Sequence, residues 1–345
     1  MLWSRARVTV VLLIFLLLVV LILPLLACQS KAAQTVVVYT SVDQVYSEPV
    51  LKKFESEIGI KVLPVFDVEA AKTTGLVNRL IAEKNRPQAD VFWNGEFAQT
   101  IMLKAEGILS AYSSPNATTI PPQYCDPDSF WAGFAGRARV LLVNTSLLPA
   151  QKYPRSLFDL LEPAYDTART GIAYPVFGTT ATQAAALYAA LGREKGRAFF
   201  ETLKQRNIRV VDGNSVVRDL VASGQLIAGL TDTDDACGAL SNKAPVTIIF
   251  PDQDGLGTLI IPNTVALIKN APHTGNAQKL IDFLLSPRTE NLLIESGWSH
   301  IALRPTSIKP QFLDTAQVRG MAVQLKEVYE QLTTVKKDMA EIFIR

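Results

Sequence analysis

A regular alternation of strand and helix patterns over residues 36–107 constrains the fold of this chain more than any other feature of its sequence. Short apolar runs, β-branched or aromatic, are typical of buried strands and occupy 36–40, 60–66 and 89–93. Segments with apolar residues at helical spacing follow them at 48–58, 75–85 and 97–106. Alternation of this kind predicts a parallel sheet covered by helices.

A second α/β group occupies the middle of the chain, and extended apolar segments near 138–144 and 258–268 connect it to the first. Two such groups joined by two crossing segments predict two lobes around a cleft. The expected first lobe is 36–137 plus about 265–310, and the second is 138–264. Residues 311–345 are expected to be a C-terminal helical segment, helical from Thr315 onward, that packs on the lobes. Ligands bind beyond the carboxyl ends of the strands in such sheets and between domains.

The first 27 residues read as a secretory signal, with Arg5 and Arg7 followed by an apolar run over 8–23. The tetrad Leu-Leu-Ala-Cys that ends at Cys28 resembles a bacterial lipobox, in which the cysteine receives the lipid and becomes the first mature residue. Residues 28–35 would then be a tether. An uncleaved membrane anchor is the alternative, because the apolar run is only slightly shorter than about 18 residues. In both cases the protein is exported to the periplasm or cell surface and held at the membrane.

Charge and cysteine usage narrow the class of protein further. The chain has 34 Lys+Arg and 32 Asp+Glu, and removal of Arg5 and Arg7 with the signal leaves 32 of each. A neutral mature chain without a basic run lacks the clustered positive charge with which proteins bind nucleic acid. Beyond Cys28 only Cys125 and Cys237 remain, and two isolated cysteines are compatible with a disulfide or with free thiols.

Several motifs resemble those of the bacterial ferric-iron-type periplasmic binding proteins. They are Val-Val-Val-Tyr-Thr-Ser at 36–41, Ala-Asp-Val-Phe-Trp-Asn-Gly-Glu at 89–96, the run from Ile261 to His273, the segment 277–287, and Ala-Leu-Arg-Pro at 302–305. The resemblance spans nearly the whole mature chain. It implies an α/β fold of the two-lobed, type II clamshell form with hinge crossover strands, no enzymatic activity, and delivery of a solute to the permease of an ABC importer. We expect a monomer without a resident cofactor.

The iron ligands implied by the resemblance transfer only in part. Members of the family commonly use a His after the first strand, a Glu after the third, and two adjacent Tyr from the second lobe. Here the first loop has Asp43 and no His, while Glu96 lies at or within one residue of the family's Glu. Where the Tyr pair would lie, the chain has Asp232, Asp234 and Asp235. The missing tyrosines disfavour classical iron binding, although carboxylate oxygens also suit hard cations.

The acids at strand ends are candidate ligands for a cation. Glu96, Asp232 and Asp235 are the predicted metal-binding residues, and each has a structural alternative. Glu96 could be an acid placed at a helix N-terminus, where the helix dipole favours it. Three aspartates within four residues repel one another in a partly buried loop, and a cation or a basic partner would offset that repulsion. The structural alternative is a solvated turn, in which water screens the charges.

Hydroxyl side chains at other strand ends are candidate ligands for an anion. Thr179 and Thr180 follow Gly178 at the start of a predicted helix, where unpaired N–H groups favour negative charge. Ordinary helix capping would explain one of the two threonines. Ser41 lies after the first strand, beside Asp43, in a comparable position.

These residues predict an extracytoplasmic binding protein for a small charged ligand, Fe³⁺ with a synergistic anion by family resemblance. The alternative ligand is a zwitterion such as an aminophosphonate, or a polyamine. A cleft hydrolase is disfavoured, because the chain has only two histidines and lacks a Gly-x-Ser-x-Gly elbow, a phosphate loop and a dinucleotide fingerprint. A structural lipoprotein is disfavoured by the α/β alternation and the absence of repeats.

Overall fold

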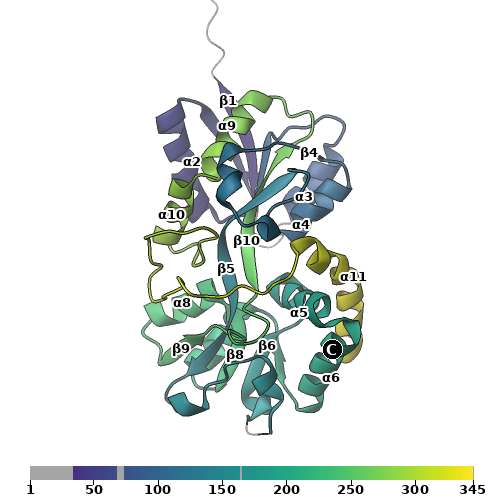
Figure 1. Cartoon of the computed structure of the whole chain (residues 1–345), viewed down its shortest axis with the longest axis vertical. Coiled ribbons are helices and arrows are strands. Elements are labelled where there is room, and N and C mark those ends of the chain that lie inside the picture. Colours follow the sequence, from purple (N-terminus) through teal and green to yellow (C-terminus); the bar gives the residue numbers. More distant parts are fainter. Residues whose placement is uncertain (1–33, 68–73, 164, 345) are drawn as a thin grey trace, which may run out of the picture.

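The computed structural model describes residues 34–67, 74–163 and 165–344, which form two α/β lobes along the long axis of the molecule (Figure 1). The two-lobed α/β fold predicted from the sequence is confirmed. The signal, Cys28 and nearly all of the tether lie outside the described residues. Within the described part of the chain, no helix is both long and apolar enough to span a bilayer.

The first lobe is built on a sheet in which the strand order is β2-β1-β3-β10-β5, with β4 paired to β10. Its strands are β1 (Thr35–Thr40), β2 (Lys61–Phe66), β3 (Val91–Asn94), β4 (Leu109–Ser110), β10 (Ile260–Ile268) and the first part of β5 (Trp131–Asn144). Its helices are α2 (Gln44–Ile58), α3 (Thr74–Ala82), α4 (Ala98–Ala105), α9 (Thr274–Leu284) and α10 (Pro287–Glu295). The predicted parallel pairing holds for β1 with β2 and for β1 with β3.

The second lobe continues the same sheet path through β5-β8-β6-β7, with β9 paired to β5. Its remaining strands are β6 (Thr170–Ala173), β7 (Arg209–Val211), β8 (Ala228–Asp232) and β9 (Val246–Ile249). Its helices are α5 (Gly178–Leu191), α6 (Arg193–Gln205), α7 (Asn214–Ala222), α8 (Thr233–Ser241) and α11 (Leu325–Ile342). Strand β6 runs parallel to β7 and β8, so the carboxyl ends of these strands share one edge.

Strands β5 and β10 form the hinge between the lobes. Residues 131–138 of β5 pair with β10, whereas residues 139–144 pair with β8 and β9. The pairing with β10 shifts register between Pro262 and Asn263, where proline cannot donate a backbone hydrogen bond. β5 is buried along nearly its whole length, although it carries Arg137 and Arg139 within an otherwise apolar run.

A third segment, which follows the last helix of the first lobe in the sequence, crosses between the lobes. Residues 300–321, here called the C-terminal strap, run from α10 to the second lobe without forming a helix (Figure 1). The prediction that the chain is helical from Thr315 is wrong, since α11 begins at Leu325. The backbone around Gly320 is extended and pairs with Thr258 instead: Thr258 N donates to Arg319 O (2.9 Å) and Met321 N donates to Thr258 O (2.8 Å).

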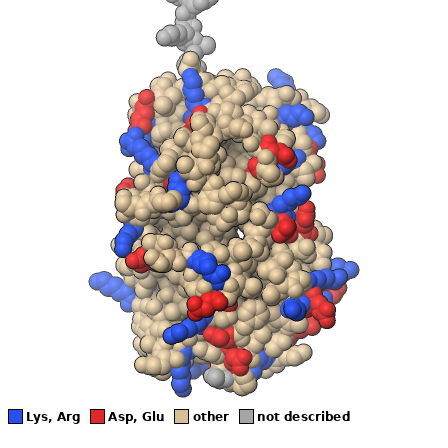
Figure 2. Space-filling view, viewed as in Figure 1, with Lys and Arg blue, Asp and Glu red and all other residues tan. Residues whose placement is uncertain are grey.

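Charge is spread over the surface without a single-sign patch on the face in Figure 2, where acidic and basic side chains alternate around the periphery. Cys125 is half-buried and Cys237 is buried, and both are free thiols. The sequence was compatible with a disulfide or with free thiols, and in the structure Cys125 and Cys237 are not bonded to each other.

Candidate functional site

The fold brings the ends of four strands to one region beside the hinge. In the first lobe these are the loops that follow β1 and β3, which carry Ser41, Asp43 and Glu96. In the second lobe they are the start of α5 after β6, with Thr179 and Thr180, and the junction of β8 with α8, with the aspartates. Ligands of parallel α/β sheets bind at such carboxyl ends.

The Glu96 carboxylate is engaged by the start of α4. It accepts hydrogen bonds from Ala98 N (2.6 Å), Gln99 N (2.9 Å) and Asn94 Nδ2 (3.1 Å). Burial raises the pKa of Glu96, and these three donors only partly counteract that effect. The geometry matches the helix-terminal role that the sequence left as an alternative, and it also holds a carboxylate at the edge of the first lobe.

Ser41 and Asn94 fix the loop that carries Glu96. The Ser41 hydroxyl donates to Asn94 Oδ1 (2.5 Å) and accepts from Gly95 N (3.0 Å), and Ser41 is buried. Thr264 of β10 secures the same loop by donating to Glu96 O (2.8 Å). Asp43 is half-buried and precedes α2, and its side chain makes no capping bond there. Ser41 therefore orients the first-lobe loop through hydrogen bonds within the protein.

A buried ion pair lies at the centre of the second-lobe residues. Arg139, fully buried on β5, donates from Nη1 to Asp232 Oδ1 at 2.7 Å. The other Asp232 oxygen accepts from Thr179 Oγ1 (2.7 Å) and Asn214 Nδ2 (3.1 Å). Arg139 also donates to Thr179 Oγ1 (3.0 Å) and to Thr180 Oγ1 (3.3 Å). The structure thus brings Asp232, Thr179 and Thr180 together around an arginine that the sequence analysis did not single out.

Arg137, two residues earlier on β5, connects the two lobes. Its Nη1 donates to Asp234 Oδ2 (3.0 Å) in the second lobe, and its Nη2 donates to Gly95 O (3.3 Å) in the first. The guanidinium also stacks over the Trp298 ring, 5.4 Å from the ring centroid. Burial lowers the pKa of Arg137, but the charges of Asp234 and Asp232 outweigh burial and raise the pKa overall. The basic partner that the acidic cluster requires is therefore supplied by the hinge strand.

Asp235 is the least well compensated of the three aspartates. Burial raises the pKa of Asp235 to about 6, the charges of Asp234 and Asp232 add to that rise, and Arg218 at 3.3 Å only partly offsets it. Carboxylate oxygens of Asp232, Asp234 and Asp235 lie within 4.8 Å of one another, a spacing that a metal ion could bridge. This group contains two of the three predicted metal-binding residues and adds Asp234, whereas Glu96 is not one of its members.

Several buried side-chain atoms near the hinge lack a hydrogen-bond partner. Within the described part of the chain, Arg139 Nε, Trp93 Nε1, Asp234 Oδ1 and His300 Nδ1 have no hydrogen-bond partner. Burial lowers the pKa of His300 to about 4; the Asp234 charge opposes this effect and the Arg137 charge adds to it. His300 is consequently neutral near pH 7. Buried polar atoms without a partner are uncommon in protein interiors.

The sequence analysis missed Arg137, Arg139, Asn214 and Trp298. A signal for the two arginines was present, because they alternate with small or apolar residues in a strand, so that both side chains point to one face. Charged residues are almost never fully buried unless they are paired, so Arg139 in an apolar strand implied an acidic partner. Nothing local marked Asn214 or Trp298, since both reach the site only through the tertiary fold.

Comparison with known proteins places the chain in a family. Residues 87–319 match the family model described as bacterial extracellular solute-binding protein. "Iron uptake protein A1" of Synechocystis is 24% identical over 318 residues, which cover 89% of this chain and 87% of that protein. A "putative 2-aminoethylphosphonate-binding periplasmic protein" of Salmonella typhimurium is 26% identical over 230 residues, 65% of each chain.

Among solved structures, a Trichodesmium protein in complex with iron and citrate superimposes with a TM-score of 0.80 at 19% identity. The match covers 90% of this chain and 100% of that one, so the two share a fold. The family model covers well over half of the sequence, and the two-lobed α/β fold is that of the solved structures. This chain belongs to the bacterial extracellular solute-binding proteins.

Proposed function

We propose that the protein is the extracytoplasmic solute-binding component of an ABC importer and captures a small charged solute between its lobes. The observation that carries this proposal is Arg137, which hydrogen-bonds to Gly95 of one lobe and to Asp234 of the other. One hinge side chain therefore contacts a backbone carbonyl of the first lobe and a carboxylate of the second, at a place where a ligand would contact both lobes. Binding without turnover is the activity, and the importer's permease is the partner.

Ferric ion held with a synergistic anion is the first candidate for the solute. Two relatives support it by their descriptions: an iron uptake protein and an iron- and citrate-bound protein of the same fold. The group of Asp232, Asp234 and Asp235 supports it chemically, since hard cations prefer oxygen ligands. The N-terminus of α5, at Thr179, would then be the place for the anion.

A zwitterion such as an aminophosphonate is the second candidate, and the arginines favour it. Arg139 and Arg137 already neutralise Asp232 and Asp234, so a bare trivalent cation would have to compete with two guanidinium groups. A zwitterion would place its anionic group near Arg139 and the start of α5, and its amine near Asp235. The Salmonella relative is described as a 2-aminoethylphosphonate-binding protein.

Thermal-shift measurements and calorimetry on the purified protein distinguish the candidates. We would test ferric citrate, ferric ion with carbonate, 2-aminoethylphosphonate and spermidine. A ligand present at 100 times its dissociation constant stabilises the folded state by about 2.7 kcal/mol, which shifts the melting temperature measurably. Asp235→Ala should remove the shift caused by the true ligand, whereas Asp219→Ala, on an exposed part of α7, should not. Absence of a shift with all four compounds would contradict both candidates.

We also propose that Cys28 is lipidated and anchors the mature protein to the membrane, because the Leu-Leu-Ala-Cys tetrad ends an apolar run preceded by arginines. Metabolic labelling with a palmitate analogue should mark the wild-type protein, and Cys28→Ser should abolish the label and leave the precursor unprocessed. Cys125→Ser is the control and should keep the label. Labelling of Cys28→Ser at the level of the wild type or of Cys125→Ser would argue against this assignment.

A further inference from the structure

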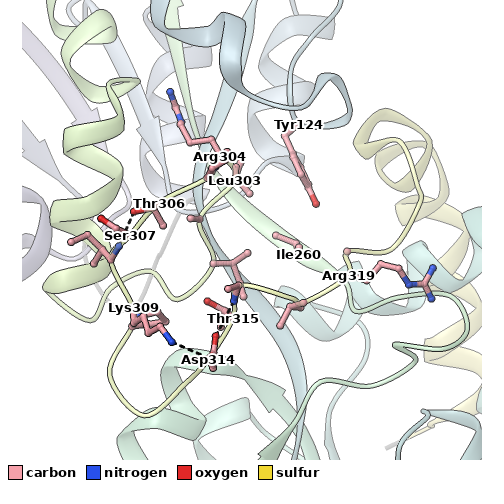
Figure 3. A pocket seen from close by; sticks show the side chains of 18 of the residues that line it. Tyr124, Ile260, Leu303, Arg304, Thr306, Ser307, Lys309, Asp314, Thr315 and Arg319 are labelled. Atoms are coloured by element: carbon pink, nitrogen blue, oxygen red, sulfur yellow. Dashed lines mark hydrogen bonds and ion pairs between the residues drawn. The ribbon is translucent and has the colours of Figure 1, made fainter.

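A cavity of about 700 Å³ lies between the hinge strands and the C-terminal strap, apart from the residues discussed above (Figure 3). Three parts of the chain line it: Tyr124 before β5, Ile260 at the start of β10, and two stretches of the strap, which include Leu303 and Thr315. Figure 3 shows the strap curving in front of the hinge strands, with the Tyr124 hydroxyl directed toward Ile260.

The cavity lies on the face of the hinge opposite to the binding residues. The side chain of Arg137 contacts Gly95 and Asp234, so it defines the face that looks toward the candidate site. Because side chains alternate along a strand, Gly136 presents the other face. A Cβ added at Gly136 would lie 3.0 Å from Ile260 Cγ2, and Ile260 lines the cavity. The two faces of the hinge therefore carry the candidate site and the cavity, respectively.

The strap is tied to the first lobe at one end of the cavity. Leu303 N and Arg304 Nε donate to the buried Glu290 carboxylate at 2.7 and 2.6 Å. The same carboxylate accepts from Ala135 N (3.0 Å) on β5, and Gly136 N donates to Ile301 O (2.6 Å). These bonds fix this part of the strap to the first lobe and to the adjoining part of the hinge.

At the other end the strap is tied to the second lobe. Arg319 donates from Nε to Gln253 O (2.9 Å) and from Nη2 to Asp252 O (3.1 Å), and its own carbonyl accepts from Thr258 N (2.9 Å). The walls are in close contact at Gly320, where an added Cβ would lie 2.9 Å from Tyr124 Oη and 2.9 Å from Ile260 Cδ1. The cavity walls thus belong to different lobes and meet at a tight contact.

We propose that this hinge-side cavity sets the balance between the open and closed forms of the protein. When two bodies turn about a shared hinge, closing them on one face separates them on the other. Atoms added to the cavity hold its walls apart and favour the closed form at the binding face. Since only the closed form contacts solute from both lobes, a larger closed fraction lowers the apparent dissociation constant in proportion. The statement about affinity rests on the proposed function, whereas the statement about lobe position does not.

Three neighbouring positions of the strap give a matched test. Thr315 and Ala316 line the cavity, while Gln317 is exposed and does not line it. Spin labels would be attached at Gln44→Cys and Ser215→Cys, exposed positions in the first turns of α2 and α7, in the full chain with Cys125 and Cys237 replaced by serine and Cys28 kept. Electron–electron distance measurements without solute should show shorter interlobe distances for Thr315→Trp and Ala316→Trp, and wild-type distances for Gln317→Trp.

Affinity gives the second readout. If the closed form makes up about 10% of the free protein or less, full closure should tighten binding of ferric citrate or 2-aminoethylphosphonate by about tenfold or more. Ala316 is exposed, so we expect its replacement to leave the protein folded, and the melting temperature of the variant tests this. The proposal is overturned if folded Ala316→Trp and Gln317→Trp give the same distance distribution as the wild type. If neither solute binds any form, the proposed solutes are wrong, and the distance measurement still decides the role of the cavity.

Discussion

Arg139 shows how a fully buried charge is accommodated in an apolar strand. Its guanidinium has one anionic partner, Asp232 at 2.7 Å, and neutral partners in Thr179, Thr180 and Asn214. Removing two charges from water is expensive, and the low-dielectric interior makes the pair's stability depend on both partners being present. Asp235 differs from this pair, because burial and the neighbouring aspartates raise its pKa and so disfavour its charged form in the folded protein.

Replacement of Arg139 tests the coupling of this pair. Arg139→Met should lower the free energy of unfolding by about 3–5 kcal/mol, because it leaves Asp232 buried without a countercharge. Adding Asp232→Asn should restore much of that loss. Urea denaturation measures both effects, and Arg288→Met, whose exposed side chain pairs with Glu57 away from this cluster, serves as the control, with a change of about 1 kcal/mol or less. Simple additivity of the two substitutions would contradict the coupling.

The raised pKa of Asp235 makes stability depend on pH in a defined direction. With a pKa of about 6 in the folded protein and 3.8 as the ordinary value, the folded state binds more protons between these values. Its stability therefore falls as pH rises through this window. Asp235→Asn should be neutral near pH 4 and stabilising by about 2–3 kcal/mol near pH 7.5, as measured by urea unfolding at both pH values. A stabilisation independent of pH would show that Asp235 carries no such penalty.

At the scale of elements, the crossings between lobes and the docking of α11 determine the architecture. β5 belongs to both halves of the sheet, so it cannot be displaced without disturbing each lobe. α11 packs against α5 and α6 of the second lobe, and its Asp338 is completely buried there. That carboxylate accepts from Tyr188 Oη (3.1 Å) and from Arg193 Nε (2.9 Å) and Nη2 (2.8 Å), and Arg197 lies 3.0 Å away.

Asp338 should therefore be the residue that holds α11 in place. Asp338→Ala leaves a buried tyrosine hydroxyl and an arginine without their acceptor and should destabilise the fold by about 2–3 kcal/mol. Hydrogen exchange should increase across residues 325–342 while the first lobe remains protected. Glu341→Ala, whose side chain is half exposed, is the control and should change exchange little. Uniform loss of protection over both lobes would mean that α11 does not unfold locally.

At the scale of the whole molecule, two lobes joined by a narrow hinge suit capture by closure. Ligands that contact both lobes favour the closed form, and hinges absorb the change in a few residues. The shift of register at Pro262 and Asn263 lies within the segment where β5 and β10 cross between the lobes. Because pairing is regular on either side of that irregularity, we expect the lobes to rotate about it as two bodies.

Closure should be visible as a change of size in solution. Small-angle X-ray scattering of the protein with a saturating solute, identified by the thermal-shift test, should give a smaller radius of gyration than the free protein. The Asp235→Ala variant, which is expected to lose binding, provides the control and should give the same radius with and without solute. Superimposable profiles of the free and saturated wild type would contradict capture by closure.

The sequence alone determined the layout of the elements, because burial of one face imposes a short-range period on each strand and helix. The alternation over 36–107 led to the parallel sheet of the first lobe, and the apolar run at 258–268 indicated a crossing strand. The same local patterns put Glu96, Thr179 and Asp232 at strand ends. Boundaries failed where distant backbone competed, as at Gly320, which pairs with Thr258 where a helix was expected.

Only the tertiary structure decided what those side chains contact. Asp232 finds its charge partner in Arg139, 93 residues away, and Asp234 finds Arg137, 97 residues away, so no local pattern could link them. Trp298 and His300 reach the hinge from beyond α10 for the same reason. Local periodicity indicates which face of an element is buried. Which residue contacts that face depends on how the lobes fold together. That contact determines how much charge a site residue can offer to a solute.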